Sequence, residues 1–213
     1  MLDLFISRKA CNSYILMQEN KDAILVDPGF NVGNKLIEHI EKIGANIVAI
    51  LITHAHYDHI TALEDVVKRF PDATTYISED EVELLTNPKL NISYFRDDGE
   101  NKILEFIPKK LVTLTDNEDF TIGEYKIKLI KTPFHTIGSA CYYVEKENAL
   151  FSGDTLFYTT IGRTDLPTGS NRTVVSSLSK LLVLPLSTKV YPGHGVTTTL
   201  ERERKYNAYL RNI

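Results

Sequence analysis

Cysteine is scarce in this chain. Only Cys11 and Cys141 occur among its 213 residues, and they do not form a CxxC pair. Two isolated cysteines cannot provide a disulfide framework or a cysteine-based metal site. Any metal ion bound by this chain would therefore need nitrogen and oxygen ligands.

Long apolar segments and a secretory leader are also missing. The apolar run at 47–52 is far shorter than the roughly 20 residues that a membrane-spanning helix requires. The opening MLDLFISRKACNSY shows no basic segment followed by an apolar stretch. We therefore expect a cytoplasmic protein without a membrane partner.

Neither sign of charge dominates the sequence. The chain has 24 Lys and Arg against 28 Asp and Glu, a formal net charge of −4 and a pI near 5.9. Such a balance gives no general attraction to nucleic acid. We expect no nucleic-acid partner, and a metal-dependent nuclease is the least favoured enzyme class.

Repeats, low-complexity tracts and Pro/Gly-rich linkers are absent too, which favours one domain over residues 1–213. Residue type and hydrophobic spacing predict strands and helices that alternate along the chain. The expected strands are 2–7, 13–18, 22–29, 47–52, 110–116, 120–122, 125–132, 140–145, 149–154 and 187–193, and the expected helices are 31–44, 60–70, 78–85, 173–183 and one from 200. This order predicts an α/β fold, an αββα four-layer sandwich with two mixed β-sheets face to face and helices outside.

One short segment concentrates coordinating side chains. THAHYDHI follows the strand at 47–52 and carries His54, His56, Asp58 and His59. In extended chain, residues two apart point the same way, and the turn into the next helix would bring His59 beside them. These donors exceed what one tetrahedral ion takes from a single loop, so we expect two metal ions.

Three further candidate ligands each follow a predicted strand: His135 in TPFHT, Asp154 in FSGDT and His194 in YPGHG. Loops gathered at one edge of a sheet are where α/β proteins usually build their sites. A lone histidine is more often satisfied or solvated, and we assign His39 that way. The seven candidates together would be a costly accident of buried polarity.

The motifs THAHYDH, TPFHT, FSGDT and YPGHG, in this order, resemble the signature motifs of metallo-β-lactamase-fold hydrolases. The resemblance extends from LVDPG to NAYL near the C-terminus, and the αββα sandwich of that family agrees with the predicted elements. GRTDLP and TTTLERERKYNAYL are most similar to the short glyoxalase II-like proteins, which include hydroxyacylglutathione hydrolase-like members.

The resemblance also implies roles for the candidate residues. One metal would be held by His54, His56 and His135, the other by Asp58, His59 and His194, with Asp154 as the bridge. We expect two divalent ions, most often Zn²⁺ in this family, with Fe or Mn as alternatives. Asp27 in LVDPG is similar to a family position near the metals and would support a histidine N–H, although it also fits a turn that ends a strand.

These features predict a binuclear metal-dependent hydrolase. Two cations sharing a water would supply hydroxide near neutral pH, and Asp58 could orient it and accept its proton, which makes Asp58 the candidate catalytic residue. A thioesterase acting on a hydroxyacyl-thiol such as S-lactoylglutathione is favoured, because a thiol with a pKa of about 8.5 leaves as thiolate without a strong acid. The partner would be a small-molecule thioester.

Other functions remain as alternatives. A mononuclear iron persulfide dioxygenase resembles the same motifs and has a GRTD-like segment. A binding-only module is disfavoured because every expected ligand is present. Arg163 and Asp165 fit a substrate contact or, as the default, a pair that fixes a loop. The substrate-binding residues, the thiol carrier and the oligomeric state stay open.

Overall fold

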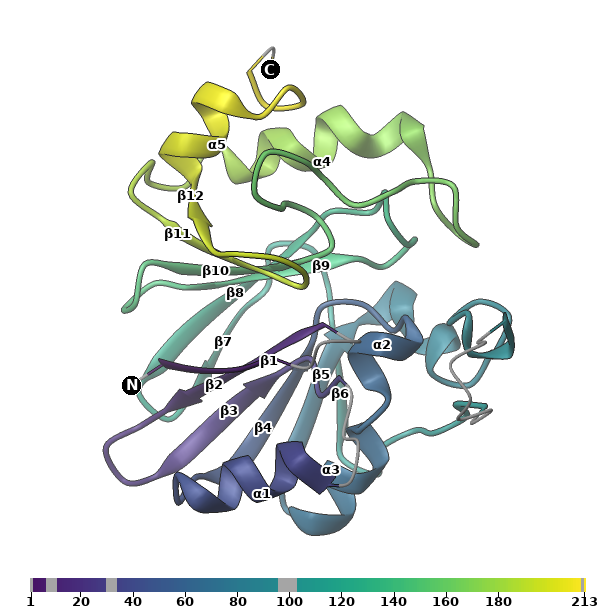
Figure 1. The fold of residues 1–213 in the computed structure, drawn as a ribbon, viewed down its shortest axis with the longest axis vertical. Helices are drawn as coiled ribbons and strands as arrows, with labels where there is room; N and C mark the ends of the chain where they lie inside the picture. Colours follow the sequence, from purple (N-terminus) through teal and green to yellow (C-terminus); the bar gives the residue numbers. More distant parts are fainter. Residues whose placement is uncertain (1, 7–10, 30–33, 96–102, 212) are drawn as a thin grey trace. The chain divides into compact units, whose positions relative to one another are not determined.

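The computed structural model describes residues 2–6, 11–29, 34–95, 103–211 and 213. The chain forms two compact units: unit 1 comprises Met1–Ile77 and Glu81–Thr113, and unit 2 comprises Ser78–Asp80 and Leu114–Ile213. Each unit is built on one mixed sheet of six strands (Figure 1). One domain over residues 1–213 stays a prediction.

The sheet of unit 1 has the strand order β1-β2-β3-β4-β5-β6. Its strands are β1 (Leu2–Ile6), β2 (Asn12–Met17), β3 (Asp22–Val26), β4 (Asn46–Ile52), β5 (Thr74–Ser78) and β6 (Leu111–Leu114). Strands β3, β4 and β5 run parallel, so their carboxyl ends lie at one edge of the sheet. Asp27 follows β3 at this edge, and His54 follows β4.

The helical segments that lie wholly or mostly in unit 1 are α1 (Lys35–Lys42), α2 (Tyr57–Ile60), α3 (Leu63–Arg69), η2 (Glu79–Leu85) and η3 (Ser93–Phe95), where η denotes a 3₁₀ helix. Figure 1 shows α1 and α3 beside each other, and both bury apolar side chains in the core of this sheet. Residues 31–33 of the predicted helix 31–44 lie outside the described residues.

The predicted helix 60–70 is broken in the structure, between α2 and α3. The N–H of Ala62 donates to the carbonyls of Pro28 (3.0 Å) and Gly29 (2.9 Å) instead of closing a helical turn. These two hydrogen bonds connect the break to the turn that follows β3.

Two further segments differ from what the sequence predicts. Residues 78–85, expected as a helix, form the 3₁₀ helix η2 from Glu79 onward. Ser78 does not cap it, since its hydroxyl has no hydrogen-bond partner among the described residues, and Glu81 accepts from the N–H of Ala55. Strand β5 was not predicted, although its sequence TTYIS is rich in β-branched residues.

The sheet of unit 2 has the order β12-β11-β10-β9-β8-β7. Its elements are β7 (Asp119–Ile122), β8 (Tyr125–Lys131), β9 (Ala140–Val144), β10 (Ala149–Gly153), η4 (Asn171–Thr173), α4 (Val174–Leu181), β11 (Lys189–Pro192), β12 (Thr198–Thr199) and α5 (Leu200–Tyr206). Strand β9 runs antiparallel to both β8 and β10, and β11 runs parallel to β10. The carboxyl ends of β8, β10 and β11 therefore share one edge, where His135, Asp154 and His194 follow.

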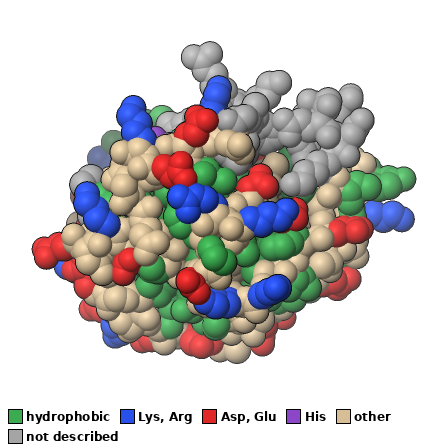
Figure 2. Space-filling view, turned by 90° about the horizontal axis from the view of Figure 1, so that it is seen from below, with side chains coloured by type: hydrophobic (Ala, Val, Ile, Leu, Met, Phe, Trp, Pro, Cys, Tyr) green, Lys and Arg blue, Asp and Glu red, His purple; other side chains and the backbone are tan. Residues whose placement is uncertain are grey.

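Surface character agrees with the balanced composition. On the face shown in Figure 2, the basic and acidic side chains are interspersed rather than separated by sign. Within the described ranges, no helix combines the length and apolar character needed to cross a bilayer.

Candidate metal centre

In unit 1, the segment after β4 gathers three imidazoles. His54, His56 and His59 are buried, and their rings are close: the centroids of His54 and His56 are 4.8 Å apart, and those of His54 and His59 are 4.0 Å apart. The half-buried Asp58 has Oδ2 4.0 Å from Nε2 of His59. All four predicted ligands of this loop are therefore neighbours within unit 1.

Asp27 supports this group from the end of β3. Its buried carboxylate accepts hydrogen bonds from the backbone N–H of Thr53 (2.8 Å), the Thr53 hydroxyl (2.7 Å) and Nδ1 of His59 (2.9 Å). Because a carboxylate only accepts, Nδ1 of His59 carries the proton and Nε2 is the atom left for coordination.

The turn that carries Asp27 is tightly packed. Asp27 has a left-handed backbone (φ 50°), and its carbonyl accepts a hydrogen bond of 2.6 Å from the Ser13 hydroxyl. A Cβ on Gly29 would lie 2.6 Å from Sγ of Cys11 and 2.7 Å from the carbonyl oxygen of Asp58, so only glycine fits there. Asp27 is thus both a turn residue and a hydrogen-bond partner of a candidate ligand.

In unit 2, Asp154 lies between two histidines. Its Oδ2 is 3.4 Å from Nε2 of His135, and its Oδ1 is 3.6 Å from Nε2 of His194. Each carboxylate oxygen faces a different imidazole. This is the arrangement that a carboxylate bridging two metal ions would need.

His135 is oriented by the loop that contains GRTD. Its Nδ1 lies 2.8 Å from the carbonyl oxygen of Arg163. A carbonyl only accepts, so Nδ1 donates and Nε2 faces Asp154. A Cβ on Gly162 would lie 2.0 Å from the carbonyl oxygen of Asp154 and 3.1 Å from Nδ1 of His135, so this loop packs directly against both candidate ligands.

The side chains of Arg163 and Asp165 form a pair on the surface of that loop. Nε and Nη2 of Arg163 donate to the two oxygens of Asp165 at 2.6 and 2.8 Å. This hydrogen bonding holds the pKa of Asp165 at about 2, well below its usual value. The geometry favours the loop-fixing assignment over a substrate contact.

One residue that contacts the loop of His54 and His56, Glu81, was not predicted from the sequence. Glu81 is fully buried, and its Oε1 accepts a hydrogen bond of 2.8 Å from the backbone N–H of Ala55. In the sequence, Glu81 stands three and four positions before Leu84 and Leu85, a helical spacing that would place it on their apolar face, although its partner Ala55 lies in a distant segment. The structure buries all three residues.

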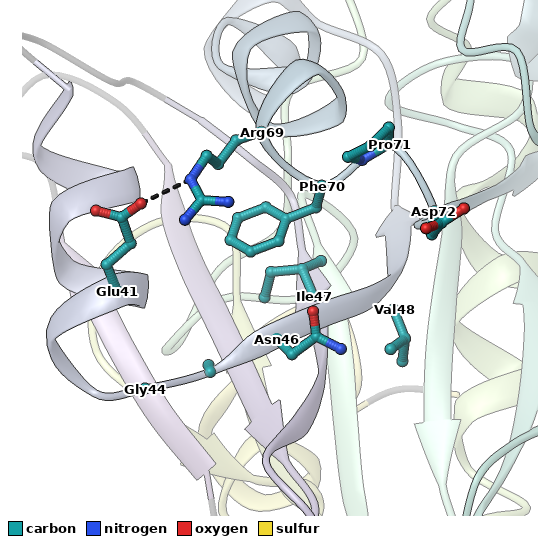
Figure 3. A pocket seen from close by; sticks show the side chains of 10 residues that line it. Glu41, Gly44, Asn46, Ile47, Val48, Arg69, Phe70, Pro71 and Asp72 are labelled. Atoms are coloured by element: carbon teal, nitrogen blue, oxygen red, sulfur yellow. Dashed lines mark hydrogen bonds and ion pairs between the residues drawn. The ribbon is translucent and has the colours of Figure 1, made fainter.

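Two other features belong to unit 1. His39 pairs with Asp3 at 2.7 Å, as expected for a satisfied histidine. A groove of about 660 Å³ is lined by Ile47, Arg69, Phe70 and neighbouring residues. Figure 3 shows these side chains from close by. The groove lies at the amino end of β4, whereas the candidate ligands of unit 1 follow the carboxyl end of this strand, roughly 20 Å away along its length.

The donors available in the two units are nitrogen and oxygen. Both cysteines are buried, and burial raises the pKa of each thiol to about 11, which disfavours the thiolate needed for metal binding. Imidazole and carboxylate together suit zinc, iron or manganese. Such ions would activate water or polarise an oxygen of a substrate.

Known proteins show the same organisation. The profile of the metallo-beta-lactamase superfamily matches residues 7–194. The chain is 36% identical over 204 residues to the probable metallo-hydrolase YqgX of Bacillus subtilis, covering 95% of this chain and 93% of that protein. It is 29% identical over 202 residues to the hydroxyacylglutathione hydrolase GloC of Haemophilus influenzae, covering 94% and 93%.

Solved structures agree. The chain is similar to the BLEG-1 B3 metallo-beta-lactamase, with a TM-score of 0.90, 37% identity and 99% of each chain covered. It is also similar to TTHA1623 in a di-iron-bound form, with a TM-score of 0.81, 29% identity and coverage of 96% and 98%. The predicted αββα fold class is confirmed by the first of these matches. Through both its sequence and its fold, this chain belongs to the metallo-beta-lactamase superfamily.

Proposed function

We propose that this chain is a binuclear metal-dependent hydrolase that cleaves a hydroxyacyl-thioester. In this proposal the donors of unit 1 (His54, His56, Asp58, His59) and those of unit 2 (His135, Asp154, His194) act together on two divalent cations. The two hydrolase relatives support the reaction class, and GloC supports the substrate class.

One observation carries the metal assignment. His59 and His135 follow different strands, yet each has Nδ1 bonded to an atom that can only accept, Oδ2 of Asp27 and the carbonyl oxygen of Arg163. A histidine whose other nitrogen donates to a carboxylate or carbonyl is typical of a metal ligand, since this bond fixes the tautomer and the ring. Two histidines whose Nδ1 is fixed by an acceptor in this way are more typical of a metal site than of a polar core.

The remaining donors fit the same group. Asp154 presents one oxygen to His135 and the other to His194, as a bridging ligand would. Asp58 is half-buried, so its carboxylate keeps access to solvent while its neighbour His59 is closed off. We assign Asp58 the additional role of orienting the attacking water and accepting its proton.

The metal ions would supply hydroxide near neutral pH and polarise the thioester carbonyl when bound. The protein residues would hold the ligands rigid, and Asp58 would take up the proton. A thiol leaving group with a pKa of about 8.5 departs without a strong general acid, which favours a thioester over an amide. Zinc is the proposed metal, and the di-iron form of TTHA1623 makes iron the alternative.

The test begins with metal analysis of protein purified without added metal. The proposal expects close to two ions per chain, and hydrolysis of S-lactoylglutathione or of the same acyl group on another thiol, such as coenzyme A. His56→Ala should abolish both, whereas His39→Ala should leave both unchanged, because His39 lies on α1, where it pairs with Asp3 and packs against the ring of Phe5. One iron per chain, with oxygen consumption on glutathione persulfide and no hydrolysis, would identify a persulfide dioxygenase instead.

A further inference from the structure

The loop that carries His54, His56 and Asp58 is anchored through its intervening residues. The N–H of Thr53 donates to Oδ1 of Asp27 (2.8 Å), that of Ala55 to Oε1 of Glu81 (2.8 Å), and that of Tyr57 to the carbonyl of Asn91 (2.9 Å). Three chain segments thus fix odd positions, while the even positions carry candidate ligands. The alternation follows from the extended backbone, which is explicit at His56 (φ −64°, ψ 148°).

Glu81 is the unusual member of these anchors. Four acidic residues fall within SEDEVELL, and Glu79, Asp80 and Glu83 are exposed, but Glu81 is 0% exposed. Burying a carboxylate is costly unless it is paired and hydrogen-bonded. Its bond to Ala55 satisfies an N–H that lies beyond the end of β4 and has no partner in the sheet ladder.

The 3₁₀ helix that holds Glu81 is itself tied to the same loop. The buried Asn91 donates from Nδ2 to the carbonyl of Leu84 (2.8 Å), and its own carbonyl accepts from Tyr57. Glu81 and Asn91 therefore accept hydrogen bonds from the backbone N–H groups of the residues before and after His56. Movement of η2 would therefore be transmitted to His56 through its neighbours Ala55 and Tyr57.

We propose that Glu81 is a positioning residue of the metal centre. Its carboxylate fixes the peptide between His54 and His56 and thereby sets the spacing of the two imidazoles for a cation. This inference rests on the proposed function, and it assigns a role to a residue outside all four ligand motifs.

Two substitutions separate the hydrogen bond from simple packing. Glu81→Gln keeps an acceptor oxygen for the Ala55 N–H, and Glu81→Met keeps the volume but removes the strong acceptor. Glu203 offers a matched control in unit 2, because it is also 0% exposed and accepts from a backbone N–H, that of Thr159, at 2.8 Å. The same two substitutions at Glu203 test the effect of losing any buried glutamate.

The readout is the affinity of metal-free protein for Zn²⁺, measured by competition with a chromophoric chelator, together with the visible spectrum of Co²⁺-loaded protein. We expect Glu81→Met to weaken binding about tenfold or more and to change the Co²⁺ spectrum, with Glu81→Gln within about threefold of wild type. Glu203→Met should lower thermal stability but leave affinity and spectrum unchanged. Wild-type affinity in Glu81→Met, or equal losses in Glu81→Met and Glu203→Met, would overturn the inference.

A measurement on the unaltered protein gives an independent check. The amide of Ala55 should exchange its hydrogen slowly in the metal-free state, because Glu81 holds it. Exchange at the rate of an exposed amide would refute the anchoring role. If the wild type binds no metal, or His56→Ala binds as well as wild type, the proposed function itself fails. Metal binding that His56→Ala abolishes and Glu81→Met leaves intact refutes only the role of Glu81.

Discussion

Oδ2 of Asp27 lies 2.9 Å from Nδ1 of His59, although the two residues are 32 positions apart in the chain. Both side chains are buried, and the same carboxylate also accepts two hydrogen bonds from Thr53. The contact joins the end of β3 to the helix α2 that begins after β4. The Asp27 carboxylate thus orients His59 and also satisfies the buried backbone N–H of Thr53.

Asp27→Asn should therefore weaken both metal binding and folding. An amide offers one acceptor oxygen where the carboxylate has two, so Thr53 and His59 cannot both be satisfied. We expect metal affinity to fall about 10- to 100-fold and the free energy of unfolding to drop by roughly 1–3 kcal/mol. Chelator competition and urea unfolding measure the two effects. Unchanged affinity would show that His59 needs no such support.

Gly162→Ala should disturb His135 and Asp154 together. The added methyl group would lie 2.0 Å from the Asp154 carbonyl, so the loop must move away and take the Arg163 carbonyl with it. Overpacking of this kind costs about 1–3 kcal/mol, and we also expect weaker metal binding. Gly44→Ala is the control: Gly44 has φ 69° and open space around it, so stability should fall by about 1 kcal/mol without loss of metal affinity. Equal affinity in the two variants would contradict the prediction.

The Arg163–Asp165 pair can be tested against a substrate-binding role. If the pair only fixes its loop, Arg163→Gln and Asp165→Asn should raise KM by similar, small factors, and the double variant should be no worse than either single one. If Arg163 bound substrate, its loss would raise KM far more than the loss of Asp165. Steady-state kinetics of the three variants on one thioester decide between these outcomes.

The buried thiol of Cys141 predicts a pH dependence of stability. Its pKa is raised by burial to about 11, so the unfolded chain, with an ordinary thiol pKa near 8.5, loses this proton first as pH increases. The stabilisation is complete below about pH 8.5 and is lost as pH rises toward 11. Urea unfolding at pH 7.5 and 10 should show a smaller fall in Cys141→Ala than in wild type. Parallel falls would exclude this thiol as a cause.

The candidate ligands were predictable from sequence because the signals that reveal them are local. An apolar run predicts a buried strand, and polar residues shortly after it predict a loop at the sheet edge, which is the basis on which His54, His135, Asp154 and His194 are candidates. Period-two spacing then grouped His54 with His56.

The supporting contacts were not predictable in the same way. Glu81 reaches Ala55 across 26 positions, and His135 reaches the Arg163 carbonyl across 28, so both depend on tertiary packing that no short pattern encodes. The break after α2 has the same origin, since the Ala62 N–H bonds to the turn at Pro28 and Gly29. A sequence window around residue 62 contains neither partner.

The groove at the amino end of β4 offers an experimental handle. Asp72 at its rim has a fully exposed side chain, and both native thiols are buried. A cysteine introduced at Asp72 would be the readily accessible thiol for a fluorophore or a surface linker, without first replacing Cys11 or Cys141. Attachment there would leave the whole length of β4 between the tether and His54, so cation titrations could be followed on immobilised protein.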